Sequence, residues 1–578
     1  MRKKAGLHPE LIEFQTYIIR ILLFLFLLSG VINVLALTGS FYMLQIYDRA
    51  LTSRSVETLL ALSGLAIGLY LFQGVLDVAR SQILVRLGAR FDDRFAPLAH
   101  RVTIDMPRFG YSPAEASERG RDVDVVRQFL SGQGPTALLD LPWTPIYLAF
   151  CYLLHPILAA VVLAGAIILG ALTFVTDLLT KHKSAATQKA AVARMKLSDT
   201  HIRNVEALRA MGFVGRSVDR FAKANREHID LQMSTTDVGG TLAGFSKVLR
   251  MILQSAVLGV GAWLVINGEL SAGAIIACSV ASARALAPVD TVIVQWKNVV
   301  AARRSYARLK ETLAALDADV DSVLLPAPMA NLKVEHITVA APGSGSVVLS
   351  EVKLELVAGQ AMGLIGPSGS GKSSFARAVT GVWPLVRGCV RLDDADINQW
   401  PLDQLGRHIG YLPQDVSLLD GTIADNISRF DPDASGLEIM AAAKGAGVHE
   451  LILRMPQGYE TQVGVNGAVL SAGQRQRIAL ARALYGSPFL VVLDEPNSNL
   501  DAAGEAALTK AIESVREQGN IAIVIAHRPS ALVACDVVGL MQGGKLVAFG
   551  PKEEVLAKTL APAASNPQMA QPATGAAQ

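Results

Sequence analysis

The chain has little charge for its length. Charged residues make up 18% of its 578 residues, whereas apolar residues make up 51%, and the mean hydropathy is +0.36. A typical soluble domain carries about a quarter of its residues as charged side chains, so the composition excludes a protein that is soluble throughout and indicates membrane spans. The formal net charge of +3 is too small to indicate nucleic-acid binding.

Cysteine is also scarce. The four cysteines, Cys151, Cys278, Cys389 and Cys535, are scattered through the chain, and none has the CxxC or Cys/His spacing that is typical of a metal site. We expect reduced, mostly buried thiols and no disulfide framework.

Long apolar runs occupy the first half of the chain. The first run follows a basic N-terminus, is longer than the ~20 residues that cross a bilayer, and has neither the short core nor the small-residue cleavage site of a secretory signal. Six runs are long enough to be membrane spans, at about 17–46, 56–75, 137–154, 157–179, 242–266 and 272–294.

Four charged residues, Lys247, Arg250, Arg284 and Asp290, lie in or near the last two runs. Charge inside a membrane is costly. We therefore expect these side chains to face the interior of a helix bundle or an aqueous path, or to lie on parts of the helices outside the bilayer, with snorkelling to the interface as the alternative.

The connections between the runs alternate in length. The two long ones, about 80–135 and 180–240, are rich in Arg and Lys, and by the positive-inside rule they and both termini are cytoplasmic. Their composition favours helices that continue out of the membrane, with turns near Pro107–Tyr111 and Met211–Phe213. Those turns could be docking sites for a cytoplasmic domain that drives the membrane half. Ordinary solvated loops are the alternative.

A phosphate-binding loop lies in the second half. The short apolar strand 361–365 leads into a sequence of the form G-x-x-x-x-G-K-[ST], and a helix follows. Glycines let several backbone N–H groups converge on a polyphosphate, the lysine adds charge, and the following hydroxyl can ligate Mg²⁺. The helix N-terminus favours anions as well. The residues predicted to bind the phosphates are Gly366, Pro367, Ser368, Gly369, Ser370, Gly371, Lys372, Ser373 and Ser374.

An apolar strand at 489–493 ends in two acids, Asp494 and Glu495. Beside a phosphate loop, an aspartate can hold Mg²⁺ and a glutamate can polarise the water that attacks the γ-phosphate. A purely structural acidic cap is the alternative. Further short strands at 332–339, 347–356 and 521–526 predict a soluble α/β domain.

These motifs follow one another in the order of an ATP-binding cassette (ABC) nucleotide-binding domain, which the second half resembles. The motifs are the phosphate loop, Gln414, the segment Leu470–Arg477, the acidic pair and His527. The six spans resemble the transmembrane half of a type IV ABC exporter. The resemblance implies a multidomain fold, with an all-α six-helix transmembrane domain followed by an α/β P-loop domain, and ATP and Mg²⁺ as cofactors.

The resemblance also implies residue roles. Glu495 would be the catalytic base, His527 would contact the γ-phosphate, and Gln414 would link Mg²⁺ and water to the membrane-domain contact. The Mg²⁺ ligands would be Ser373, Gln414 and Asp494. The signature residues Ser471 and Gly473 would close over ATP held by the other protomer, which requires a dimer, here a homodimer.

Three positions depart from the family pattern. Ala472 replaces the middle glycine of LSGGQ, which is tolerable if its φ is negative. The segment Val339–Gly343 lacks the aromatic residue that usually stacks on adenine, and Val465 replaces an acid that usually contacts the partner. Adenine selectivity and that partner contact are therefore in question.

Segments of the membrane half narrow the resemblance. They resemble the type I secretion ABC transporters of Gram-negative bacteria, and among these the protease-exporter branch; generic packing residues shared by many exporters are the alternative. The segments are 42–49, 52–55, 141–147 and 210–212. Fewer than twenty residues precede the first span, so we expect no peptidase appendage, which suits substrates with an uncleaved C-terminal signal.

The resulting hypothesis is ATP-driven export of a protein across the bacterial inner membrane, toward a periplasmic membrane-fusion adaptor and an outer-membrane channel. An ABC exporter of lipid, peptide or small molecule is the first alternative, and an ATP-gated regulator that moves no cargo is the second. The expected parts are a cytoplasmic N-terminus, a transmembrane domain, a linker, a cytoplasmic nucleotide-binding domain and a disordered tail, at 1–16, 17–312, 313–330, 331–560 and 561–578.

Overall fold

The computed structural model describes residues 9–314, 325–464, 467–526 and 529–560. The chain forms two compact units. Of the described residues, the first unit comprises 9–104 and 113–314, and the second comprises 105–112, 325–464, 467–526 and 529–560. All four cysteines have free thiols, and three of them are buried, as the sequence predicted.

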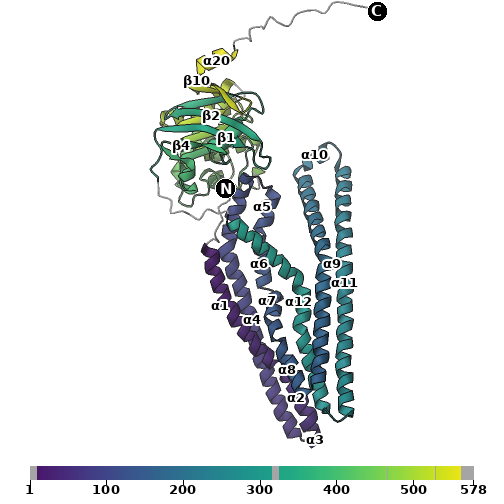
Figure 1. Cartoon of the computed structure of the whole chain (residues 1–578). Coiled ribbons are helices and arrows are strands. Elements are labelled where there is room, and N and C mark those ends of the chain that lie inside the picture. The colour runs from purple at the N-terminus through teal and green to yellow at the C-terminus, as the bar shows by residue number, and fades with distance from the viewer. Residues whose placement is uncertain (1–8, 315–324, 465–466, 527–528, 561–578) are drawn as a thin grey trace, which may run out of the picture. The chain divides into compact units, whose positions relative to one another are not determined.

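The described residues of the first unit form helices joined by short connections (Figure 1). Short π-helical and 3₁₀ turns lie at Ile46–Ala50 and Leu141–Trp143. The helices are α1 (Pro9–Leu35), α2 (Thr38–Gln45), α3 (Leu51–Ser53), α4 (Val56–Asp105), α5 (Pro113–Gly120), α6 (Asp122–Leu130), α7 (Gln133–Asp140), α8 (Thr144–Leu154), α9 (Pro156–Arg203), α10 (Val205–Ala210), α11 (Val214–Ile266) and α12 (Ala272–Leu313).

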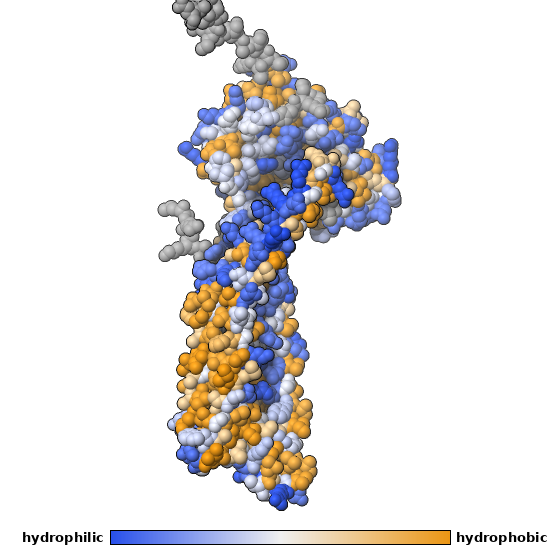
Figure 2. All heavy atoms as spheres, turned by 90° about the vertical axis from the view of Figure 1, so that its right-hand side faces the viewer, coloured by the Kyte–Doolittle hydropathy of each residue, from blue (hydrophilic) through white to orange (hydrophobic). Residues whose placement is uncertain are grey.

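Six helical stretches in the described residues are long and apolar enough to cross a membrane. The first five contain the corresponding expected spans, and the sixth, Ala272–Val292, coincides with the expected span 272–294 except for its last two residues. Hydrophobic side chains cover much of the surface of this unit (Figure 2). On α4, for example, they include the exposed residues Leu60, Leu65, Ile67, Leu71 and Val75. Such a surface is stable against lipid and not against water, so the prediction of six spans is confirmed.

The three longest helices far exceed the length of a membrane span. Helices α4, α9 and α11 have 50, 48 and 53 residues, whereas ~20 residues cross a bilayer. The expected turns are present as well: a 3₁₀ turn at Met106–Phe109 ends with Gly110 at φ 90°, and Gly212 at φ 69° separates α10 from α11.

The first span is broken, which the apolar run did not predict. Helix α1 ends at Leu35 and α2 begins at Thr38, with neither proline nor glycine between them. At the break, the N–H of Leu37 bonds to the carbonyl of Val34, and the hydroxyl of Tyr147 donates to the carbonyl of Asn33 at 3.0 Å. A side chain from another helix therefore satisfies an acceptor that the break leaves open.

Asp48, from the segment 42–49, caps a distant helix. Its Oδ1 accepts from the N–H of Gly273 at 3.0 Å and its Oδ2 accepts from the hydroxyl of Ser271 at 2.6 Å. Ser271 is itself the N-cap of α12. A carboxylate at this position satisfies otherwise unpaired N–H groups and interacts favourably with the helix dipole. The pair of spans that carries Asp48 is thereby tied to the start of α12.

Two of the four charged residues in the last spans form an ion pair. The guanidinium of Arg250 on α11 lies 2.6 Å from Asp290 on α12. Pairing lowers the cost of holding both charges at membrane depth. The predicted orientation toward the bundle interior stays a prediction for these residues, because the side chain of Arg250 is 45% exposed.

The second unit contains two sheets. The antiparallel sheet has the order β2-β1-β4-β5, and the mixed sheet has the order β10-β9-β3-β8-β7-β6 with β9, β3, β8, β7 and β6 parallel. The strands are β1 (Asn331–Ala340), β2 (Val347–Val357), β3 (Ala361–Ile365), β4 (Arg387–Leu392), β5 (Ala395–Asp396), β6 (Ile409–Leu412), β7 (Leu490–Asp494), β8 (Ile521–Ile525), β9 (Val537–Gln542) and β10 (Lys545–Pro551).

Helices and the smaller sheet cover the two faces of the mixed sheet. Alternate residues of β7 and β8 pack into two different cores: one contains the residues of α15 to α19, the other those of α13 and the antiparallel sheet. Strands buried on both faces need the uninterrupted apolar runs seen in the sequence. The helices are α13 (Lys372–Val379), α14 (Leu402–His408), α15 (Ile423–Ile427), α16 (Gly436–Gly445), α17 (His449–Leu453), α18 (Ala472–Leu484), α19 (Ala502–Glu517) and α20 (Lys552–Leu560).

The segment Asp105–Ser112 belongs to the second unit although it follows α4 in the chain. Arg108 donates to the carbonyls of Val382 and Gly381 at 3.0 and 2.8 Å. Gly110 lies against the backbone of Gly343, where a Cβ atom on Gly110 would be 2.2 Å from the nitrogen of Gly343. Only glycine allows this approach of one backbone to another.

The cap on α12 can be tested by removing it. We expect Asp48→Ala to destabilise the protein by about 1 kcal/mol, the typical effect of losing an N-terminal cap, and Asp48→Asn to lose less because it keeps an oxygen acceptor. The measurement is thermal unfolding of the full chain in detergent. Asp219→Ala, which removes an exposed carboxylate on α11, is the control, and equal melting temperatures for Asp48→Ala and this control would refute the cap.

Candidate nucleotide-binding site

The phosphate loop connects β3 to α13, as the sequence predicted. Gly366 has φ 152°, and a Cβ atom there would lie 2.2 Å from the carbonyl oxygen of Met541. Gly371 is the N-cap of α13 with φ 99°. Both positions therefore require glycine, and between them the chain closes a tight loop over the N-terminus of a helix, where anions are favoured.

Lys372 is folded back over this loop and is only 5% exposed. Its Nζ donates to the carbonyls of Gly366 and Pro367 at 2.8 and 2.9 Å. Burial lowers the pKa of its ammonium group, against the opposing effect of Glu495 and Asp494. The two carboxylates thus help to keep a buried cation charged beside the loop.

Asp494 ends the central strand β7 and is 1% exposed. Its Oδ1 accepts from the hydroxyl of Ser373 at 3.2 Å, and within the described residues its buried Oδ2 has no hydrogen-bond partner. Burial raises the pKa of this carboxyl group, and the charge of Glu495 raises it further. A buried carboxylate oxygen without a partner is costly.

This arrangement fits Mg²⁺, a hard cation that prefers oxygen ligands and usually keeps only one or two from the protein. The unpartnered oxygen of Asp494 and the hydroxyl of Ser373 are the groups that would hold it. In the described residues, no cluster of three or more His, Cys, Asp or Glu side chains offers an alternative metal site.

Glu495 follows directly and has a positive φ of 50°. Its N–H donates to the carbonyl of Ile525 on β8 at 3.1 Å. Gln476 of α18, which is 3% exposed, donates from its amide to the carbonyl of Glu495 at 3.3 Å. Sequence reasoning missed Gln476, although a polar residue on the otherwise apolar inward face of a helix was a possible signal.

Gln414 and His527 are the two remaining residues with predicted roles at the site. Gln414 follows β6, in which Leu412 pairs with Leu493 of β7, so it leaves the sheet at the same end as Asp494; its side chain is exposed. His527 lies outside the described residues, as does Val465. The roles given to Gln414 and His527 stay predictions.

The signature segment begins α18. The hydroxyl of Ser471 accepts from the N–H of Gln474, and the side chain of Gln474 accepts from the N–H of Ser471, which makes a capping box. Ala472 is the first helical residue and is not among the residues with positive φ, so the departure from glycine costs no strain. Gly473 lies close to Asn499, whose carbonyl oxygen a Cβ would approach to 2.9 Å.

The structure does not join the signature segment to the phosphate loop of its own chain. In the described part of the molecule, no hydrogen bond links Ser471 or Gly473 to residues 366–374. The N-terminus of α18 is exposed at Ser471 and Ala472. These two residues are therefore accessible to another molecule.

Comparison with known proteins finds a family match for each half of the chain. Residues 349–498 match the family model described as "ABC transporter", and residues 115–289 match the model described as "ABC transporter transmembrane region". A bacterial Atm1-family ABC exporter with ATP bound shares the fold at a TM-score of 0.79 and 22% identity, over 94% of this chain and 96% of that one.

Two relatives in sequence are secretion proteins. The type I secretion system ATP-binding protein PrsD of Rhizobium meliloti (strain 1021) is 50% identical over 92% of each chain. The toxin RTX-I translocation ATP-binding protein of Actinobacillus pleuropneumoniae is 28% identical over 95% of this chain and 78% of the relative.

The electrostatic coupling between the two acids yields a prediction. Because Glu495 raises the pKa of Asp494, we expect Glu495→Gln to lower that pKa. Since a protonated carboxyl group does not hold Mg²⁺, Mg²⁺-dependent nucleotide binding should persist to a lower pH in the variant than in the wild type. Binding of a fluorescent ATP analogue at several Mg²⁺ concentrations and pH values measures this.

The control for this experiment is Glu517→Gln, which removes an exposed carboxylate at the far end of α19. In this control, the pH at which nucleotide binding is lost on acidification should be the same as in the wild type. If that pH is also the same in Glu495→Gln and the wild type, the two carboxyl groups are not coupled.

Proposed function

The chain belongs to the ABC transporter family, among the type I secretion ATP-binding proteins, and from this membership we propose that it exports a protein substrate across the bacterial inner membrane. It is a multi-pass transporter that couples ATP hydrolysis to transport. The similarity to PrsD along nearly the whole chain is the observation that carries the proposal, because it includes the membrane half as well as the ATPase half.

We place the substrate in the class of unfolded proteins that carry an uncleaved C-terminal signal. A relative is a translocator of an RTX toxin by name, which supports a protein as the substrate. Among type I secretion proteins, we assign the chain to the protease-exporter branch.

The chemistry follows from the residues at the sheet edge. Loop residues 366–374 wrap the phosphates of ATP with backbone N–H groups, and Lys372, once released from the loop carbonyls, neutralises the β- and γ-phosphates. Ser373, Asp494 and Gln414 would hold Mg²⁺, which would supply charge neutralisation for the transferred phosphoryl group. Glu495 accepts a proton from the attacking water, and His527 contacts the γ-phosphate.

A second copy of the chain completes each site in this proposal. One chain carries one phosphate loop and one signature segment, and the exposed start of α18 supports a role toward a partner molecule. Ser471 and Gly473 then close over ATP held by the other protomer of a homodimer. Two bound ATP molecules close the dimer, and hydrolysis releases it.

For orientation, the Arg-rich and Lys-rich continuations of α4, α9 and α11 support a cytoplasmic location of these helix ends. The N-terminus and the nucleotide-binding unit are on the same side. Substrate then leaves through the opposite face toward a periplasmic adaptor and an outer-membrane channel. The parts at 1–16, 17–312, 313–330, 331–560 and 561–578 keep their assigned roles in this scheme.

The test compares proteins in the culture medium of cells that carry the wild type or Glu495→Gln at equal expression. Because the variant lacks the proposed base, we expect hydrolysis to fall by two orders of magnitude or more, and one or a few full-length proteins to vanish from the medium and accumulate inside.

Glu517→Gln at the same expression level serves as the control and should secrete normally. If the medium is the same for the wild type and Glu495→Gln while the gene is expressed, protein export is wrong and an exporter of lipid or small molecule takes its place.

A further inference from the structure

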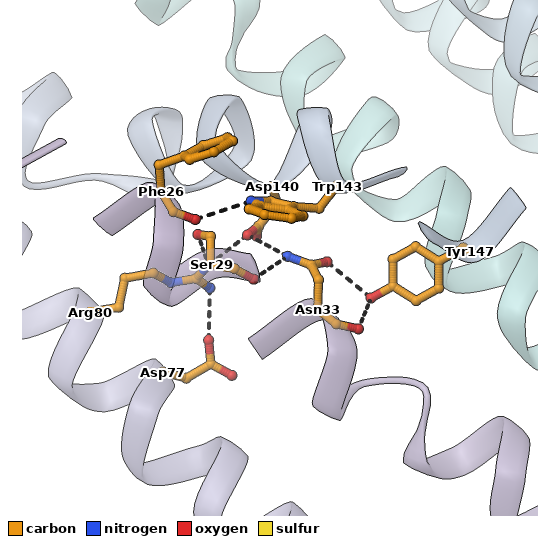
Figure 3. A network of polar contacts seen from close by, with 8 residues as sticks. All are labelled: Phe26, Ser29, Asn33, Asp77, Arg80, Asp140, Trp143 and Tyr147. Atoms are coloured by element: carbon orange, nitrogen blue, oxygen red, sulfur yellow. Dashed lines mark hydrogen bonds and ion pairs between the residues drawn. The ribbon is translucent and has the colours of Figure 1, made fainter. Parts of the chain in front are cut away.

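Arg80 of α4 is a buried cation in the membrane unit, 7% exposed (Figure 3). Its Nη2 donates to Asp77, three residues earlier on the same helix, at 2.7 Å. Its Nη1 donates to Asp140 of α7 at 2.7 Å and to the hydroxyl of Ser29 of α1 at 2.9 Å. One guanidinium therefore joins three helices.

A second group of bonds joins α1 to α7 and α8 without α4. Asn33 donates to Asp140 at 3.0 Å, and Tyr147 donates to the carbonyl and the side-chain oxygen of Asn33, both at 3.0 Å. The indole N–H of Trp143 donates to the carbonyl of Phe26 at 3.1 Å. The rings of Trp143 and Phe26 also contact each other, with their centroids 4.9 Å apart and their planes tilted by 30°. This group also holds the break between α1 and α2.

The network therefore divides along one line. On one side lie Arg80 and Asp77, both on α4; on the other lie the bonded residues of α1, α7 and α8. Of the network drawn in Figure 3, only the two bonds from Nη1 of Arg80 cross between the sides. A packed core elsewhere fixes α1 to α4: the rings of Phe14 and Phe95 meet edge to face at 5.1 Å.

Opening that line changes the partners of both charges. Arg80 keeps Asp77, whose side chain is 41% exposed and so partly solvated. Asp140, whose side chain is 18% exposed, keeps the amide of Asn33 but loses its cation. Because removing the partner of a buried charge is unfavourable, the bond from Arg80 to Asp140 favours the closed arrangement until the transport cycle opens it.

We propose that the bonds from Arg80 to Asp140 and Ser29 form a latch that opens and closes in each transport cycle, with the aromatic contact of Phe14 and Phe95 as the fixed end. The latch rests on the proposed ATP-driven transport cycle but on no particular cargo. Asp77 bonds Arg80 in the closed arrangement and is the partner that stays with it in the open arrangement.

The latch predicts that Ser29→Ala and Asp77→Asn, which both introduce an uncharged side chain, change the ATPase activity in opposite directions. Ser29→Ala removes a bond made only in the closed arrangement, so opening becomes easier and ATPase activity of the purified full-length protein without substrate rises. Asp77→Asn weakens the partner on which the open arrangement depends, so the same activity falls. Each change should be about two- to tenfold, the effect of one hydrogen bond on an equilibrium.

Asp93→Asn, an exposed carboxylate on α4, is the matched control and should leave the activity unchanged. Thermal unfolding of each variant separates a loss of fold from a shift of the latch. If the bonds of Arg80 instead stay closed throughout the cycle, Ser29→Ala and Asp77→Asn should change activity in the same direction. That result would overturn the latch.

The two proposals fail separately. If the wild type secretes no protein but the ATPase effects have opposite signs, protein export is wrong and the latch stands. If secretion depends on Glu495 while the two substitutions act in the same direction, export stands and the latch is wrong.

Discussion

The carboxylate of Asp494 imposes the constraint on which the ATPase half depends. A charged group at the end of a fully buried strand needs compensation, and only one of its oxygens has a hydrogen-bond partner within the described residues. The phosphate loop, the buried lysine and the serine hydroxyl all lie where they can supply that compensation or receive it from a bound cation. The site is thus built so that its own charges are balanced best when Mg²⁺ and nucleotide are present.

Much of this half could be predicted from sequence because its signals are local. The loop Gly366–Ser374 and the strand before Asp494 are set by glycine conformations and by apolar runs of strand length, and both appear where expected. Gln476 could not be assigned from sequence because its role depends on which face of α18 turns toward the loop after Glu495. The roles of Gln414 and His527 depend on a bound ligand and on residues beyond the described part.

In the membrane half, the spans could be predicted from sequence but the contacts between them could not. Hydropathy found the six spans because apolar length alone decides them. It missed the break after Leu35, because a run of apolar residues does not reveal that Tyr147, more than a hundred positions later, takes over the carbonyl of Asn33. Asp48 is similar: its position in a motif was visible, but its bonds to Ser271 and Gly273 depend on tertiary structure.

The length of the long helices has a mechanical consequence. Helix α11 has 53 residues without a proline, which at 1.5 Å per residue makes a rod of about 80 Å. A rod of that length acts as a lever: tilting it by about 5° moves the far end by roughly 7 Å, more than one helical turn. Rearrangements no larger than a change of hydrogen-bond partner at one end can therefore become displacements at the other end that are wide enough to reposition a whole side-chain layer.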